Sequence, residues 1–154
     1  MSLQVRSSSF EHNSFIPQKH AYRLRCLGDN ISPALQWTPG PEGTKSYAIV
    51  MYDPDAVGGF VHWVVYNIPP TITSLPEMKD GTEYLPQDAL LCTNDFPFPG
   101  YGGMCPPTGK PHHYEFSVYA LSKKLPYGLE ARQVSSHINQ SLLAKGTLIG
   151  LYQT

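Results

Sequence analysis

Charged residues are scarce in this sequence. Only 15% of its 154 residues are Asp, Glu, Lys or Arg, and the formal net charge is −1. No face rich in Lys or Arg can be traced along the chain, and a nucleic-acid partner requires such a basic surface. Long apolar runs are also missing, since no segment approaches the roughly 20 residues of a membrane-spanning helix. We therefore expect no nucleic-acid partner and no membrane span.

Two further features bear on the cellular compartment. The opening residues, MSLQVRSSSFEHNSF, lack the apolar core of a secretory signal peptide. This predicts a cytoplasmic protein, unless a leader has been trimmed from it. The three cysteines, Cys26, Cys92 and Cys105, are odd in number and show no CxxC spacing, which argues against a zinc site and a disulfide framework. Scattered reduced thiols are the favoured interpretation, although a disulfide between any two of them stays open.

Proline, glycine and tyrosine are abundant instead. Fifteen prolines and thirteen glycines are spread along the chain, together with ten tyrosines and short β-branched runs. Such punctuation is typical of a mainly all-β domain with long ordered loops. No internal repeat and no linker interrupts the chain, so residues 1–154 are expected to form a single domain with its own core.

Three strands are indicated in the middle of the chain. Lys45–Asp53 alternates and then runs apolar, Phe60–Ile68 is rich in Val and aromatic residues, and His113–Leu121 alternates. The continuous apolar run Trp63–Tyr66 indicates a central strand that is covered on both faces, as in a β-sandwich. Weaker strand candidates are Leu3–Arg6, Tyr22–Cys26 and Leu148–Tyr152.

One segment near the C-terminus has helical spacing instead. Ala131, Val134, Ile138 and Leu142 recur on one helical face, and Gly146 is the expected stop. This predicts one amphipathic helix that packs on a sheet and precedes a last strand.

A long loop is expected between Pro69 and Pro111. Its second half holds Phe96, Phe98 and Tyr101 among glycines and prolines. Aromatic rings require cover, so this part is expected to form an ordered wall that builds a site.

The residues that could carry chemistry sit where the strands begin and end. Asp53 and Asp55 close one expected strand, His62 opens the next, and the bend Gly102–Pro107 precedes the pair His112-His113. A carboxylate that accepts a hydrogen bond from an imidazole fixes its tautomer and raises its basicity. Two imidazoles held in this way, beside the backbone N–H groups of the glycine-rich bend, would suit a small anion such as a phosphate monoester.

Each of these residues also has a purely structural interpretation. Asp53 and Asp55, on either side of Pro54, could be turn formers whose side chains accept backbone hydrogen bonds. His112 and His113 are neighbours on one strand, so they point to opposite faces and only one of them can enter a shared pocket. Spacing alone leaves both interpretations open.

Four stretches in their order carry a resemblance to a known family. They are SPALQW (Ser32–Trp37), PEGTKSYAIVMYDPDA (Pro41–Ala56), HWVVYNIP (His62–Pro69) and GYGGMCPPTGKPHHYEFSVYAL (Gly100–Leu121). Together they resemble the phosphatidylethanolamine-binding protein family, above all its short bacterial and archaeal branch, often labelled Raf kinase inhibitor-like. The resemblance implies a β-sandwich of two sheets with one peripheral C-terminal helix. It also implies a small pocket for phosphate, acetate or a phosphoethanolamine-like head-group.

The resemblance carries site residues over position by position. It places His112 in the pocket and turns His113 away. At Val57 the family commonly has a proline with a cis bond; because a cis bond before another residue costs about 2.5–4 kcal/mol, we expect a trans bond here and a changed rim. With two residues that come from the glycine-rich bend, Gly103 and Cys105, the expected ligand-binding set is Asp53, Asp55, His62, Gly103, Cys105, Pro106, Pro107, His112 and Tyr114.

The predicted function is a non-enzymatic binding module without cofactor or metal ion. Carboxylates beside a bound anion are tolerable if they keep an imidazole donating, or if the ligand itself carries a proton. One alternative is a hydrolase that uses Asp53 and His62, or a metal site that adds Asp55 and His112; Cys105 is the only candidate nucleophile. Another is an inhibitor of a protease or kinase that acts through its outer surface. A protein partner and a homodimer also stay open.

Overall fold

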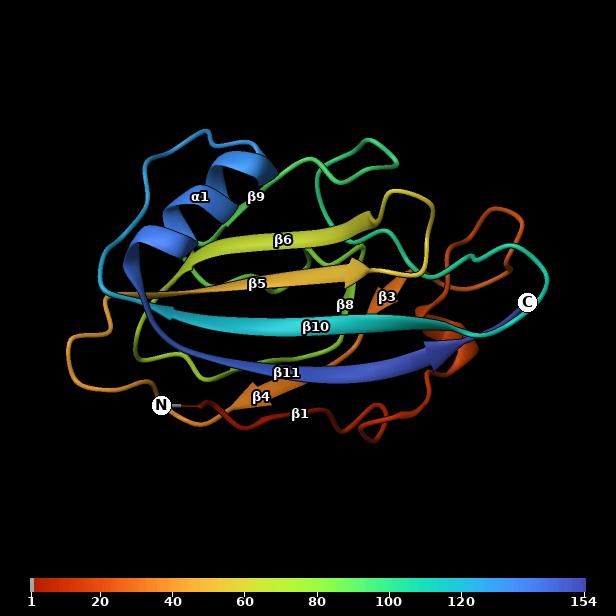
Figure 1. The fold of residues 1–154 in the computed structure, drawn as a ribbon, viewed down its shortest axis with the longest axis horizontal. Helices are drawn as coiled ribbons and strands as arrows, with labels where there is room; N and C mark the ends of the chain where they lie inside the picture. Colours follow the sequence, from red (N-terminus) through yellow and green to blue (C-terminus); the bar gives the residue numbers. More distant parts are fainter. Residues whose placement is uncertain (1) are drawn as a thin grey trace.

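The computed structural model describes residues 2–154 and is built around one six-stranded sheet (Figure 1). The sheet has the order β2-β11-β10-β5-β6-β9, in which only β2 runs parallel to its neighbour. Its long strands are β5 (Ser46–Asp53), β6 (Phe60–Ile68), β10 (His112–Leu121) and β11 (Leu142–Tyr152), and α1 is Ala131–Ser141. The short elements are β1 (Val5–Arg6), β2 (Ser14–Phe15), the 3-10 helix η1 (Gln18–His20), β3 (Ile31–Ser32), β4 (Leu35–Trp37), β7 (Ser74–Leu75), β8 (Met78–Lys79) and β9 (Leu90–Leu91).

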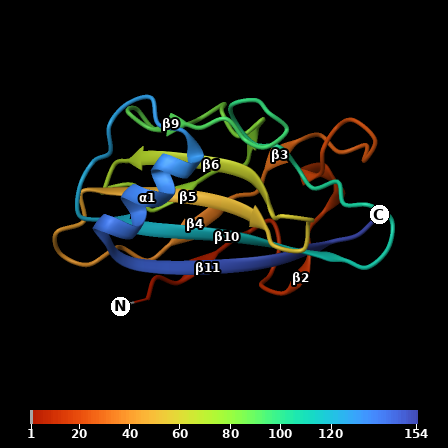
Figure 2. The ribbon, with the colours of Figure 1, turned by 45° about the horizontal axis from the view of Figure 1, so that its top comes forward.

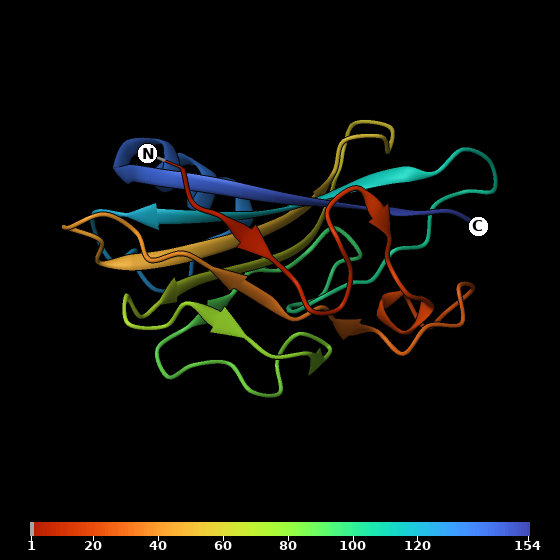
Figure 3. The ribbon, with the colours of Figure 1, turned by 90° about the horizontal axis from the view of Figure 1, so that it is seen from below.

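The large sheet is covered on both faces, which confirms the expected β-sandwich with a peripheral helix. Figure 3 shows the short strands β1, β4 and β7, and the pair β3-β8, on the side of the sheet away from α1. Alternation explains this, because Trp63 and Val65 enter the core under the short strands while Val64 and Tyr66 pack toward the helix. The three strands predicted in the middle of the chain are confirmed, and β10 begins one residue earlier than expected.

The helix is confirmed, but its predicted end is wrong. It ends at Ser141, and Gly146 lies inside β11, opposite Val118. A Cβ at Gly146 would lie 2.2 Å from the carbonyl oxygen of Leu3, so the glycine permits a close approach of two backbones rather than a helix stop. Val134 and Ile138 are buried as expected, whereas Leu142 is already extended and exposed.

The segment Tyr22–Cys26 is not a strand, contrary to the prediction. It forms a turn in which Leu27 N–H donates to the carbonyl of Arg23, and Arg25 has a left-handed φ of 71°. The interpretation of three scattered thiols is also wrong, because Cys26 and Cys105 form a disulfide across 79 residues. Spacing could not reveal this pair, because only the fold brings the two segments together.

The ends of four long strands meet at one end of the molecule. Figure 2 shows β5 and β11 ending there, while β6 and β10 begin there. The β5–β6 loop, the turn around Cys26 and the bend before β10 approach the same end. Among residues 2–154, no helix is long and apolar enough to cross a membrane.

Candidate functional site

A small pocket opens at this end of the sheet, with a volume of about 150 Å³. Asp53 reaches it from the end of β5, His62 from the start of β6, and His112 and Tyr114 from the start of β10. The rings of His62 and His112 both lie near Tyr114, with centroids 5.3 Å and 6.5 Å from its ring. The structure therefore brings together the two histidines that the sequence analysis placed in one site.

The remaining wall comes from the bend before β10. Cys105, Pro106 and Pro107 line the pocket, so it contains seven of the nine residues of the expected set. Because Cys105 is bonded to Cys26, it offers no free thiol, and the candidate nucleophile of the hydrolase hypothesis is excluded.

Asp53 combines the structural and the chemical role that sequence spacing left open. Its Oδ1 accepts hydrogen bonds from the N–H groups of Asp55 and Ala56 at 2.8 and 3.2 Å, which shapes the turn after β5. Its Oδ2 accepts a hydrogen bond from Nδ1 of His112 at 2.6 Å. The carboxylate is almost fully buried, so it is held in place while it orients the imidazole.

His62 is oriented by the backbone and not by a carboxylate, which corrects the expectation that both imidazoles are held by acids. Its Nδ1 donates a hydrogen bond to the carbonyl of Gly102 at 2.6 Å, and its own carbonyl accepts one from the Gly102 N–H at 2.9 Å. Burial lowers the pKa of His62 from its ordinary 6.5 to about 4, although the Gly102 carbonyl and the Asp53 carboxylate oppose the shift. The ring is therefore neutral at neutral pH.

Tyr114 contributes a hydroxyl group that is available to a ligand in the pocket. The hydroxyl is buried beside the Asp53 carboxylate, and among residues 2–154 no acceptor lies within ordinary hydrogen-bond geometry of it. Burial raises the pKa of Tyr114 well above its ordinary value, and the nearby Asp53 carboxylate adds to this, so the phenol keeps its proton. A buried hydroxyl without a partner is costly unless a ligand supplies one.

Two of the expected residues do not line the pocket. Asp55 turns outward, where its Oδ2 accepts hydrogen bonds from both the N–H and Nδ1 of His113 at 2.7 Å. These hydrogen bonds lower the pKa of Asp55. Gly103 packs against the backbone of His20, and its N–H donates to Oδ1 of Asn30 at 2.7 Å. The N–H groups of Gly102 and Gly103 are thus already used, so the expectation that they face an anion is wrong.

Sequence reasoning missed several residues that shape the site. Phe60, Phe96 and Ala56 line the pocket, and only Phe96 had a sequence signal, as an aromatic in the expected wall. Asn30 is buried below the bend; its Nδ2 donates to the carbonyl of Tyr101 at 2.7 Å while its Oδ1 accepts from Gly103. No local pattern singles out this Asn, because its two partners in the bend lie more than 70 residues away.

The rim at Val57 agrees with the expectation of a trans bond. The cis peptide bond found among residues 2–154 joins Phe96 and Pro97, so the bond before Val57 is trans. The Val57 side chain projects fully into solvent at the tip of the β5–β6 loop.

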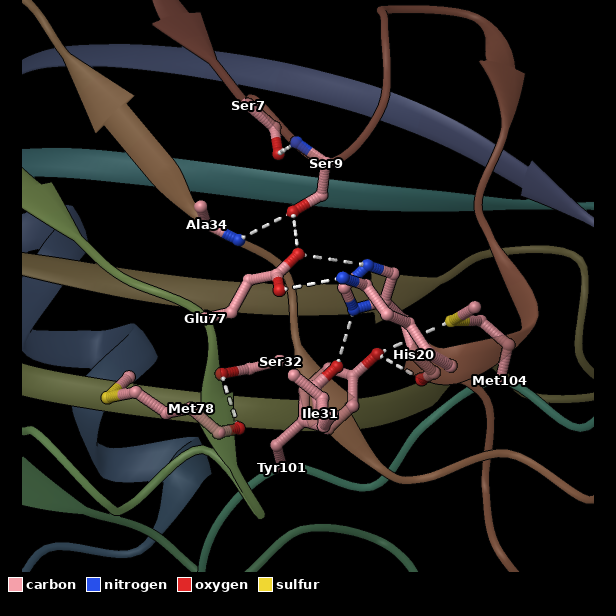
Figure 4. Close-up of polar contacts among 11 residues, drawn as sticks. Ser7, Ser9, His20, Ile31, Ser32, Ala34, Glu77, Met78, Tyr101 and Met104 are labelled. Carbon is pink, nitrogen blue, oxygen red and sulfur yellow. Dashed lines mark hydrogen bonds and ion pairs between the residues drawn. The ribbon is translucent and has the colours of Figure 1, made fainter.

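A second polar cluster, around the buried His20, lies outside the pocket (Figure 4). Nδ1 of His20 donates to the carbonyl of Ile31 at 2.7 Å, while Glu77 accepts hydrogen bonds from Ser9 at 2.6 Å and Lys19 at 2.8 Å. Burial lowers the pKa of His20. The Tyr101 hydroxyl donates to the His20 carbonyl at 2.7 Å, so this cluster supports the segment that leads to Gly102.

The arrangement of acids and histidines does not resemble a metal centre. Within the described part of the chain, no three His, Cys, Asp or Glu side chains are grouped as a set of metal ligands. Asp53 and Asp55 instead pair with His112 and His113 in two separate contacts.

Comparisons with known proteins agree over nearly the whole chain. The family model of the phosphatidylethanolamine-binding proteins matches residues 6–153. YbcL of Escherichia coli is 46% identical over 133 residues, which are 81% of this chain and 72% of that protein. A relative from Aquifex aeolicus is 40% identical over 158 residues, covering 98% of this chain and 88% of that one. The crystal structure of YbcL, described as a new member of the mammalian PEBP family, matches with a TM-score of 0.92 at 40% identity and covers 100% of this chain and 99% of that chain.

Proposed function

Because the chain belongs to the phosphatidylethanolamine-binding protein family, we propose that it binds a small anion in the pocket formed by Asp53, His62 and His112. The ligand carries a phosphate or carboxylate group, as inorganic phosphate, acetate and phosphoethanolamine do. The observation that supports this most directly is the Asp53–His112 hydrogen bond at the wall of the same pocket as His62.

The chemistry of the pocket suits such a ligand. The Asp53 carboxylate can only accept, so it holds the hydrogen on Nδ1 of His112 and compensates the charge when Nε2 is protonated as well. That second N–H then donates to the anion. Pro106, Pro107 and Phe96 cover the site with apolar groups, and such low-polarity surroundings strengthen a charge-assisted hydrogen bond.

We propose binding without catalysis. A hydrolase would need an activated nucleophile, whereas Cys105 is in a disulfide and Asp53 is engaged by His112 and two backbone N–H groups. His62 retains an unprotonated Nε2 that could act as a base, which is the one observation in favour of an enzyme. Hydrolysis of a phosphate ester that persists through repeated purification and disappears in His62→Ala would support that alternative.

The disulfide also bears on the compartment. Disulfides persist in oxidising compartments and are rare in a reducing cytoplasm. We propose that the Cys26–Cys105 bond favours an oxidising location over the cytoplasm that the opening residues indicated.

Ligand-observed NMR tests the binding proposal. Phosphate esters, carboxylates and lipid head-groups are screened with the wild type and with His112→Ala. Saturable binding of phosphate or phosphoethanolamine that is lost in His112→Ala supports the proposal. No binding of any of these anions, or equal binding by the variant, would contradict it.

A further inference from the structure

The two nitrogens of His62 have different roles. The Gly102 carbonyl can only accept a hydrogen bond, so the hydrogen of the neutral ring sits on Nδ1. Nε2 then carries a lone pair, and it has no hydrogen-bond partner among residues 2–154 although the ring lines the pocket. The ring therefore presents an acceptor to a ligand, not a donor.

None of the titratable groups around the His62 ring changes the conclusion that its Nδ1 carries the hydrogen and its Nε2 the lone pair. Asp53 at the end of β5 and Asp95 in the loop between β9 and β10 are negative and raise the pKa of His62. Burial lowers this pKa by more than both carboxylates raise it. From β10, His112 is engaged by Asp53, and Tyr114 stays protonated. Cys105, in the bend, does not titrate because it is in the disulfide.

The pocket thus combines an acceptor with donors. His62 Nε2 accepts, while the Tyr114 hydroxyl, which lies beside the Asp53 carboxylate, has a hydrogen to donate. His112 supplies the charge-assisted donor on the side held by Asp53. An anion whose oxygens all lack hydrogen would direct an oxygen lone pair at the lone pair of His62 Nε2 and would cover this acceptor without giving it a donor.

Building on the proposed function, we infer that the pocket selects anions that carry their own hydrogen, namely phosphomonoester and phosphonate monoanions. Their P–OH group donates to Nε2 of His62 while the charged oxygens accept from His112 and Tyr114. A phosphodiester has the same single charge but no P–OH, and acetate likewise carries no hydrogen on its oxygens, so both bind more weakly than a phosphomonoester monoanion. The soluble head-group phosphoethanolamine is a monoester and binds, whereas the same head-group within a phospholipid is a diester and does not.

A matched pair of small anions tests directly whether the P–OH hydrogen is needed for binding. Methylphosphonate and dimethylphosphinate are both monoanions at about pH 5, and they differ only by OH in place of CH₃; phosphate monoesters, with a second pKa of about 6, are monoanions there as well. In isothermal titration calorimetry we expect methylphosphonate to bind at least about tenfold more tightly. Equal affinities, or tighter binding of the phosphinate, overturn this inference and leave the proposed function standing. If neither methylphosphonate nor inorganic phosphate binds, both fail.

Two variants locate the effect. His62→Phe removes the acceptor in an aromatic environment of Phe60 and Phe96, and it should reduce the ratio between the two anions to about one. Tyr114→Phe removes a donor that both anions use, so it should weaken both and preserve the ratio. A ratio unchanged in His62→Phe contradicts the inference.

The tautomer can be measured without any variant. In ¹⁵N NMR of the histidine side chains at neutral pH, His62 should show a protonated Nδ1 and an unprotonated Nε2 in the free protein. A protonated Nε2 in the free protein overturns the inference, even if His62→Phe does not fold.

The source of the phosphate is tested by competition. Phosphoethanolamine should displace methylphosphonate, whereas phosphatidylcholine vesicles that contain phosphatidylethanolamine should act no differently from phosphatidylcholine vesicles alone. Displacement by the phosphatidylethanolamine vesicles alone would overturn the selection against diesters.

Discussion

His112 donates a hydrogen bond through Nδ1 to Oδ2 of Asp53 over 2.6 Å, although 59 residues separate the two. The next residue, His113, makes the same kind of contact with Asp55 over 2.7 Å. Neighbours on a strand point to opposite faces, so one pair lines the pocket and the other faces solvent. The exposed Asp55–His113 pair therefore serves as a control for the Asp53–His112 pair that lines the pocket.

The first prediction uses these adjacent pairs. His112→Ala should weaken the binding of inorganic phosphate about tenfold to a hundredfold, since a hydrogen bond to a charged group contributes about 1.5–3 kcal/mol. His113→Ala should leave the affinity within about twofold, because that side chain is more than half exposed and does not line the pocket. Calorimetric titration of both variants checks this. Equal losses in both would show that the effect is not specific to the pocket.

Acid should destabilise the fold through His62. Its pKa is lowered from 6.5 to about 4. Between pH 4 and 6.5 His62 therefore binds a proton in the unfolded chain but stays neutral in the native protein. The contribution of the neutral His62 to the free energy of unfolding is complete above about pH 6.5 and is lost as the pH falls toward 4. The loss amounts to at most about 3 kcal/mol. His20, whose pKa is also lowered by burial, acts in the same direction.

Urea unfolding at a series of pH values measures this slope. His62→Phe should flatten the slope between about pH 4 and 6.5, whereas His113→Ala should retain it. A wild-type free energy of unfolding that is constant over this range would refute the assignment of a buried neutral ring.

Removal of the disulfide should lower stability. Cys26→Ser combined with Cys105→Ser opens a loop across 79 residues, and a loss of roughly 2–5 kcal/mol in the free energy of unfolding is expected. Cys92→Ser is the control, since the hydroxyl can keep the contact that Sγ of Cys92 makes with the Leu129 carbonyl, so it should cost less. Alkylation of the unfolded, unreduced protein should modify one cysteine; modification of three would disprove the bond.

Asn30 is expected to position the bend that carries Gly102, and through it the His62 ring in the pocket. Asn30→Ala removes the hydrogen bonds to the Tyr101 carbonyl, the Gly103 N–H and the Asp80 carboxylate. The first two groups are then left buried and unpaired, so a loss of about 2–4 kcal/mol in stability is expected. Because Gly102 lies between them, its carbonyl should move and the ¹⁵N signals of His62 should change. A variant that is only less stable, with unchanged His62 signals and phosphate affinity, would show that Asn30 does not position the ring.

Much of the fold follows from local pattern. Alternation predicted β5 and β10, and the continuous apolar run Trp63–Tyr66 in β6 predicted a central strand covered on both faces, because side chains on a strand project alternately and both faces meet apolar layers. Helical spacing predicted α1 through Val134 and Ile138. The same reasoning misjudged Gly146, since a glycine that ends a helix and one that admits a neighbouring backbone look alike in sequence.

The sequence by itself determined which residue types were available at the strand ends, and that Asp53, His62 and His112 could meet there. Only the tertiary structure decided that Asp53 pairs with His112 while His62 pairs with a carbonyl, that Cys26 reaches Cys105, and that Asn30 uses the N–H of Gly103. The reason is physical: a strand is specified by its own alternation, whereas a hydrogen-bond partner and a pKa depend on distance and burial, which are set by segments far apart in the chain.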